Sequence, residues 1–128
     1  MEPLVETRNL KKYFKTSKGE LHAVDGIDLS INTGKTLGVV GESGCGKSTL
    51  GRTILRLVEP TSGEILFEGQ NVQGYDARGM RALRKSMQMI FQDPYSSIDP
   101  RLTVSDIILE PMIVNGIART RAAAAARV

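Results

Sequence analysis

A glycine-rich run between an apolar segment and an amphipathic pattern constrains this chain more than any other feature. The run follows the pattern G-x-x-x-x-G-K-[ST] and consists of Gly41, Glu42, Ser43, Gly44, Cys45, Gly46, Lys47 and Ser48. A polyphosphate needs several backbone N–H donors that face inward, and glycines keep Cβ atoms out of their way. A helix that begins directly after the run adds free N–H groups and the positive end of its dipole. The run therefore predicts a phosphate-binding loop.

Two side chains at the end of the run have specific predicted roles. Lys47 is expected to reach the outer phosphates. The hydroxyl of Ser48 is expected to bind Mg²⁺, because this ion prefers oxygen ligands and usually shares its shell with phosphate oxygens. Thr49 completes the set of residues expected to contact the ligand. The alternative interpretation of the run is a glycine-rich turn with an exposed lysine.

The segments on either side of the run predict the context that a phosphate loop requires. Residues 36–40 show no alternation of polar and apolar side chains, which is typical of a strand covered on both faces in a parallel sheet. The loop is therefore expected at the centre of a sheet. After the loop, four apolar residues recur at helical spacing: Leu50, Ile54, Leu57 and Val58. This helix is expected to pack on the sheet and to end at residues 60–63.

The other segments predict short strands and helices separated by polar turns. In residues 26–31 apolar and polar residues alternate, which indicates a half-buried strand. Thr103 is expected to cap a helix that has Asp106 in its first turn and Pro111 at its end. The remaining predicted elements are strands at 4–14, 64–67 and 87–91 and helices at 80–85 and 119–128.

Composition excludes several classes of protein. With 128 residues, 41% hydrophobic and 24% charged, the chain is expected to form one globular domain or part of one. The net charge of +3 is mild and the basic residues lack interleaved aromatics, so no nucleic-acid partner is expected. Neither a long apolar run nor a secretion signal is present in the sequence, which favours the cytoplasm. A single cysteine, Cys45, fits a reducing compartment.

Four stretches of the chain carry a further likeness. They are residues 9–14, 22–30, 41–48 and 89–101, of which the last includes the run Asp93, Pro94, Tyr95, Ser96 and Ser97. Together they resemble the nucleotide-binding subunit of ATP-binding-cassette (ABC) transporters. The last stretch is similar to that of the subgroup that drives bacterial importers of oligopeptides, dipeptides and related small solutes.

The resemblance implies an α/β fold of the P-loop NTPase class, of the ABC ATPase type, with an antiparallel β part at the N-terminus. Residues 1–102 would form part of the ATP-binding core, and residues 103–128 the start of a helical subdomain at which the chain is truncated. ATP and Mg²⁺ are the implied ligands. The implied partners are membrane-spanning permease subunits and a second ABC ATPase subunit. Such an assembly would place the chain on the inner face of the cell membrane.

The resemblance also assigns roles to residues outside the loop. Tyr13 would stack on the adenine ring, with Val24 packing nearby. Gln92 would reach Mg²⁺ and the attacking water, at a hinge before the helical subdomain. Lys47 and Gln92 would therefore be the catalytic residues, and Ser48 and Gln92 the residues that bind the metal.

Hydrolysis in the family depends on three further pieces that do not occur in this sequence. They are a Leu-Ser-Gly-Gly-Gln type signature, an apolar strand that ends in Asp-Glu, and a downstream histidine. The chain alone is therefore expected to bind ATP and to hydrolyse it poorly, although the family consists of ATP hydrolases. Two alternatives stay open: another P-loop NTPase such as a kinase or GTPase, in which Asp93 would bind the metal, or a truncated nucleotide-binding fragment without catalytic activity. His22, the single histidine, is assigned no role.

Overall fold

The computed structural model describes residues 3–93 and 95–127, which fall into two compact units. The first unit ends at Gln88 and the second begins at Met89. The first unit contains all of the described strands, and the second contains two helices.

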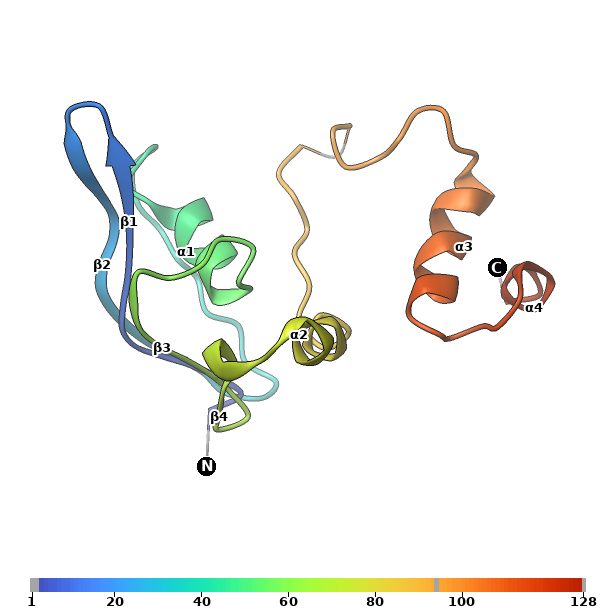
Figure 1. Cartoon of the computed structure of the whole chain (residues 1–128), viewed down its shortest axis with the longest axis horizontal. Coiled ribbons are helices and arrows are strands. Elements are labelled where there is room, and N and C mark those ends of the chain that lie inside the picture. The colour runs from blue at the N-terminus through green and yellow to red at the C-terminus, as the bar shows by residue number, and fades with distance from the viewer. Residues whose placement is uncertain (1–2, 94, 128) are drawn as a thin grey trace. The chain divides into compact units, whose positions relative to one another are not determined.

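A four-stranded antiparallel sheet forms the frame of the first unit, with the strand order β2-β1-β3-β4 (Figure 1). Its strands are β1 (Val5–Thr16), β2 (Gly19–Ile31), β3 (Ser62–Phe67) and β4 (Gln70–Asn71). Within residues 27–31 the apolar side chains are half-buried and the alternating polar ones are exposed, as predicted. The strands predicted at 4–14, 26–31 and 64–67 are confirmed, and β2 begins earlier because a tight turn after β1 returns the chain along it.

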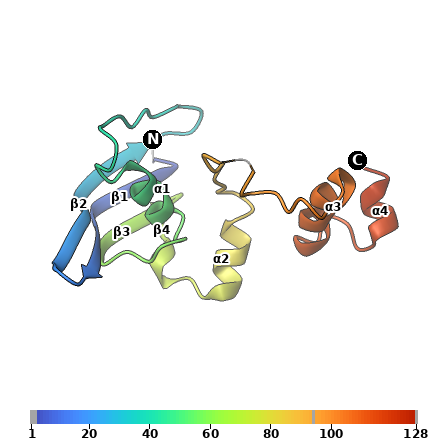
Figure 2. The ribbon, with the colours of Figure 1, turned by 90° about the horizontal axis from the view of Figure 1, so that it is seen from above.

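The core of the first unit lies between this sheet and three short helical segments. These segments are α1 (Lys47–Ile54), the 3-10 helix η1 (Val72–Gly74) and α2 (Ala77–Leu83). Figure 2 shows two of them, α1 and α2, beside the strands. The buried cluster consists of Leu10, Val24, Leu50, Ile65, Val72, Met80 and Leu83. Leu50 brings α1 into this cluster, so the helix after the glycine-rich run packs on the sheet as predicted. The helix α2 begins before the predicted residue 80 because the side chain of Asp76 caps it, accepting a hydrogen bond from the Gly79 amide at 2.8 Å.

The helix α1 is shorter than predicted, because it ends at Ile54 and not at residues 60–63. Arg56 has a φ of 49°, which lies in the left-handed region and is incompatible with a continuing right-handed helix. Its guanidinium donates hydrogen bonds to the backbone oxygens of Val72 at 2.7 Å and Tyr75 at 3.1 Å. These bonds fix the end of α1 to the chain around η1, and the helical spacing of apolar residues does not reveal them.

Residues 36–40 do not form the predicted strand, so the expectation that the loop lies at the centre of a sheet is wrong. Val40 is 93% exposed. Residues 87–91 likewise have no strand, and Ile90 is 100% exposed. A continuous apolar strand needs hydrogen-bonded neighbours and cover on both faces. The ladders among the described strands leave both segments without a pairing strand.

The second unit contains α3 (Val104–Val114) and α4 (Arg121–Ala125). Its buried cluster consists of Leu109, Ala118 and Ala124. The hydroxyl oxygen of Thr103 accepts a hydrogen bond from the Asp106 amide at 3.2 Å, so the predicted cap of α3 is confirmed. The helix predicted at 119–128 is present as the shorter α4, capped by Thr120.

Pro111 lies inside α3, so the prediction that it ends this helix is wrong. Proline removes one N–H donor, but its φ is compatible with a helix. The helix continues to Val114, and the Asn115 amide then donates to the Pro111 carbonyl at 3.0 Å. None of the helices in the described ranges combines the length and the apolar character that a membrane crossing demands.

Candidate functional site

The glycine-rich run leads directly into the first turn of α1. Gly46 is the residue before the helix and has a φ of 82°, and Gly44 has a φ of 78°. Both values lie in the left-handed region, which glycine enters without steric cost. Between them the Cys45 amide donates a hydrogen bond to the Glu42 carbonyl at 3.2 Å, which closes a turn in the loop. The run is therefore a folded loop in which two of the three glycines are required by backbone conformation.

Gly46 also lies in direct contact with strand β2. A Cβ atom at this position would come within 2.0 Å of the Ala23 carbonyl oxygen, closer than any real contact. The absence of a side chain thus lets the start of α1 approach the backbone of β2. This contact fixes the loop to the sheet, although residues 36–40 on its other side form no strand.

The side chain of Lys47 folds back over the loop. Its Nζ donates hydrogen bonds to the carbonyl oxygens of Gly41 at 2.8 Å and Glu42 at 3.1 Å. The ammonium group is thereby held over the start of the loop, whose other end is the N-terminus of α1 and so the positive end of the helix dipole. Ser48 lies next to it in the first turn of α1 and is exposed. A cradle of backbone donors with a cation at its edge is the arrangement that a polyphosphate requires.

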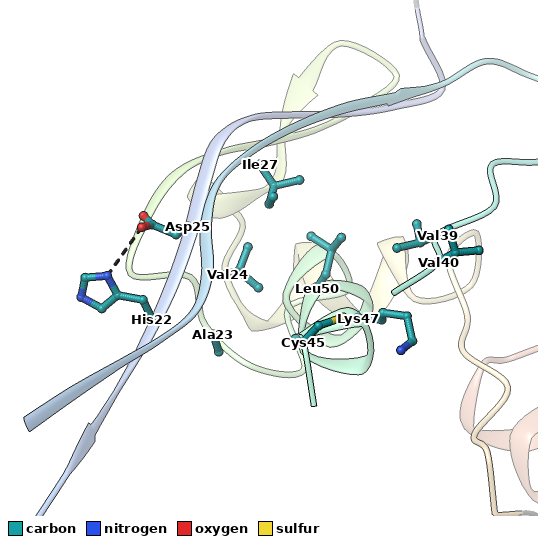
Figure 3. Close-up of a pocket in the computed structure, with 11 residues that line it drawn as sticks. His22, Ala23, Val24, Asp25, Ile27, Val39, Val40, Cys45, Lys47 and Leu50 are labelled. Atoms are coloured by element: carbon teal, nitrogen blue, oxygen red, sulfur yellow. Dashed lines mark ion pairs between the residues drawn. The ribbon is translucent and has the colours of Figure 1, made fainter. Parts of the chain in front are cut away.

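A cavity of about 330 Å³ opens beside the loop. Its lining comes from β2, from residues 39 and 40, and from the loop with α1. Figure 3 shows Val24, Ile27 and Leu50 gathered on one side as an apolar wall, with Lys47 at the loop. A cavity with an apolar wall and a cationic end suits a ligand that has an apolar part and an anionic part.

Tyr13 lies on β1 outside the lining of this cavity and has two partners on β2. Its ring stacks on the ring of His22, with centroids 3.7 Å apart and planes 9° from parallel. Its hydroxyl donates a hydrogen bond to Oδ1 of Asp25. This hydrogen bond is the main reason that the pKa of Tyr13 is raised to about 12. The same bond is the first cause of the lowered pKa of Asp25.

His22 is a residue of this site that sequence reasoning missed. Its Nε2 lies 3.3 Å from Oε1 of Glu20, and its Nδ1 lies 3.6 Å from Oδ2 of Asp25. Both His22 and Asp25 border the cavity, and Figure 3 shows their side chains on the other side of the β2 ribbon from Lys47, pointing away from the apolar wall. The signal was available in the sequence, since a hairpin with a two-residue turn at residues 17–18 pairs Tyr13 with His22.

The structure brings some of the predicted site residues together. Val24 is buried in the core and lines the cavity with Cys45, Gly46 and Lys47. Gln92 is exposed and belongs to the second unit, so its predicted role at the metal stays a prediction.

Asp93, the alternative metal ligand, has its carboxylate in a local turn. Its Oδ1 accepts a hydrogen bond from the Tyr95 amide at 3.0 Å, and its carbonyl accepts from the hydroxyls of Ser96 and Ser97. Within the described ranges, no group of three histidine, cysteine or acidic side chains could hold a metal ion. A serine hydroxyl that shares a metal with phosphate oxygens does not require such a group.

Comparison with known proteins identifies relatives that match most of the chain. The family described as "ABC transporter" matches residues 24–128. The oligopeptide transport ATP-binding protein OppF of Bacillus subtilis is 51% identical over 121 residues, which cover 94% of this chain and 40% of that protein. A putative peptide import ATP-binding protein of Brucella ovis is 45% identical over 90% of this chain and 36% of its own length. The chain therefore spans about two fifths of the length of such curated relatives.

Solved structures of ATP-binding cassettes share the fold. The cassette MJ0796, in a dimeric post-hydrolysis state bound to ADP and Pi, aligns with a TM-score of 0.74 and 26% identity, covering 87% of this chain and 47% of its own. A nucleotide-free ATP-binding cassette from an ABC transporter aligns with a TM-score of 0.70 and 28% identity over 88% of this chain and 41% of its own. The predicted fold class is therefore confirmed.

Proposed function

This chain belongs to the ABC transporter family, and we propose that it is the ATP-binding part of an energy-coupling subunit of an importer for peptides or related small solutes. The names of its relatives support the solute class, because several are oligopeptide or peptide import ATP-binding proteins. The membrane-spanning permease subunits and a second ATPase subunit are proposed as partners, and the inner face of the cell membrane as the location.

One observation carries the proposal, namely the geometry of residues 41–48. The loop has left-handed glycines at 44 and 46, an ammonium group held by two of its own carbonyls, and a helix that begins at its end. An anion that enters this loop would meet backbone N–H groups and Lys47 together. A glycine-rich turn with an exposed lysine, the alternative interpretation, does not explain why Lys47 folds back over the loop or why Gly46 contacts β2.

The residues of the first unit fit both ends of ATP. Lys47 would exchange its two carbonyl acceptors for oxygens of the outer phosphates, and the exposed hydroxyl of Ser48 would offer an oxygen ligand to Mg²⁺. When bound, the metal neutralises charge on the phosphates. Val24 and the apolar wall would pack against the nucleoside, and Tyr13 would stack on the adenine ring.

Gln92 is proposed to bind Mg²⁺ and to position the attacking water, at the hinge before the helical subdomain. Efficient hydrolysis is proposed for the complete subunit only. The sequence of this chain contains neither the family's signature nor the strand that ends in Asp-Glu, so it lacks the carboxylate that would polarise the attacking water and the loop that would close over the γ-phosphate.

The test is a calorimetric titration of the full chain with MgATP. Lys47→Ala should abolish measurable binding, with a loss of about 100-fold or more in affinity, because it removes the charge that meets the phosphates. Lys35→Ala is the matched control, since Lys35 is an exposed lysine in the turn before residues 36–40. Unchanged affinity in Lys47→Ala, or an equal loss in both variants, would contradict the proposed function.

A further inference from the structure

The side chain of Tyr13 is held at two points by strand β2. Asp25 accepts the hydrogen bond of its hydroxyl, and His22 covers one face of its ring at a centroid distance of 3.7 Å. A hydrogen bond to an ionised carboxylate is stronger than a neutral one, and a stacked ring pair adds a geometric restraint of its own. The two contacts act on different parts of the ring, so together they restrict its rotation.

His22 and Asp25, the two residues that hold Tyr13, also lie close to each other. His22 lies 3.6 Å from Oδ2 of Asp25, while Oδ1 of the same carboxylate accepts the hydrogen bond of Tyr13. Glu20, at 3.3 Å, borders the other ring nitrogen of His22. The imidazole therefore has an acidic neighbour at each nitrogen, and these contacts fix its plane parallel to the phenol ring.

Tyr13 is partly exposed, and His22 occupies one face of its ring. No second ring and no cation lies over the opposite face in the part of the chain that the structure describes. His22 and Asp25 also border the cavity that Gly46 and Lys47 line, so the two residues that hold the ring belong to the wall of the cavity beside the proposed phosphate site.

We propose that His22 and Asp25 are positioning residues for ATP, which hold Tyr13 so that its uncovered face receives the adenine ring. The inference rests on the proposed function, since it concerns the base end of the same ligand. Both residues act through Tyr13 and make no contact with the phosphates. Their effect is therefore confined to ligands that carry a base.

Inorganic tripolyphosphate distinguishes the positioning of Tyr13 for the base from a general structural role of His22 and Asp25, because it has the polyphosphate tail of ATP and no base. The full chain is titrated with the magnesium complexes of ATP and of tripolyphosphate. His22→Ala should weaken ATP binding by about threefold to tenfold, which is the range expected for one aromatic pair, and should leave tripolyphosphate binding unchanged. His22→Phe keeps a flat ring at the same place and should restore ATP affinity.

Asp25 is tested in the same way. Asp25→Ala should weaken ATP binding selectively, and Asp25→Asn, which keeps an acceptor oxygen, should weaken it less. In a Tyr13→Ala background, neither His22→Ala nor Asp25→Ala should have any further effect, because the residue through which they act is gone.

The outcomes that overturn the inference differ from those that overturn the proposed function. Unchanged ATP affinity in His22→Ala would overturn it, as would an equal loss for ATP and tripolyphosphate, which would indicate a general structural role. A further loss from His22→Ala in the Tyr13→Ala background would show that the base stacks on His22 directly. Failure of the unsubstituted chain to bind either ligand would overturn the proposed function and this inference with it.

Discussion

The two segments at residues 36–40 and 87–91 are richer in apolar residues than the β1–β2 hairpin, yet only the hairpin forms strands. The hairpin forms a long ladder, whereas the two segments form no strand and expose Val40 and Ile90. The hairpin contains its own pairing partner across a two-residue turn. Residues 36–40 and 87–91 have no pairing strand among the described ladders. Apolar content alone therefore does not produce a strand, and the source of the hydrogen-bonding neighbour decides the outcome.

The largest expected effect comes from the same substitution made in the two kinds of segment. Ile65 in β3 is 0% exposed and Ile90 is 100% exposed. Ile65→Ala should lower the free energy of unfolding by about 2–5 kcal/mol, because it removes buried methyl groups and leaves a cavity. Ile90→Ala should change it by less than about 0.5 kcal/mol. Chemical denaturation followed by circular dichroism measures both, and similar losses in the two variants would show that residues 87–91 are packed.

The next largest effect comes from replacing a glycine at each end of the phosphate loop: Gly46, directly before α1, and Gly38, in the segment that leads into the loop. Gly46→Ala would place a Cβ within 2.0 Å of the Ala23 oxygen at a left-handed φ, whereas a Cβ at Gly38 meets nothing within 4 Å. Gly46→Ala should therefore destabilise the fold by at least about 1–3 kcal/mol and weaken MgATP binding, and Gly38→Ala should do neither. Thermal unfolding and calorimetry test this pair. Native-like affinity in Gly46→Ala would mean that the loop does not depend on its contact with β2.

The smallest effect concerns pH and the side chains that join the hairpin strands. The pKa of Tyr13 is raised from 10.0 to about 12, chiefly by its hydrogen bond to Asp25. A raised pKa in the folded state contributes stability below pH 10, which is lost as the pH rises from 10 toward 12. The pKa of Asp25 is lowered from 3.8, so its contribution is present above that value and is lost as the pH falls through the folded-state pKa.

An ultraviolet titration of the phenol groups measures the alkaline side of this prediction. Asp25→Asn should bring one phenol titration down toward 10, and Asp99→Asn, which changes a carboxylate paired with Arg101, should leave it in place. A phenol titration that is the same in the unsubstituted chain and in Asp25→Asn would rule out the Tyr13 to Asp25 bond in solution.

Local signals in the sequence predicted local structure well. The glycine pattern indicates the loop, the alternation in residues 26–31 indicates β2, and Thr103 can be identified as a cap because its partner is three residues away. Each of these features depends on residues that are close in the chain. The same is true of the pairing of Tyr13 with His22, which turn length predicts once the turn is identified.

The features that could not be predicted depend on distant partners. The end of α1 is set by the bonds of Arg56 to backbone oxygens near η1, and the apolar pattern contains no sign of them. Residues 36–40 have the composition of a buried strand. Whether these residues form a strand depends on whether other strands are there to pair with them. The proposed role of Gln92 likewise cannot be predicted from local sequence, because it requires a defined arrangement of the two units.

The two carbonyl contacts of Lys47 bear on which ligands the proposed site would accept. The ammonium group of Lys47 already donates hydrogen bonds to two peptide carbonyl oxygens. A ligand must therefore bind the ammonium group more strongly than these two oxygens do in order to replace them. A neutral or singly charged molecule gains little from such an exchange, whereas a tail with several negative charges gains much. In the proposed site Lys47 would therefore favour highly charged anions, and in their absence its two hydrogen bonds hold the start of the loop.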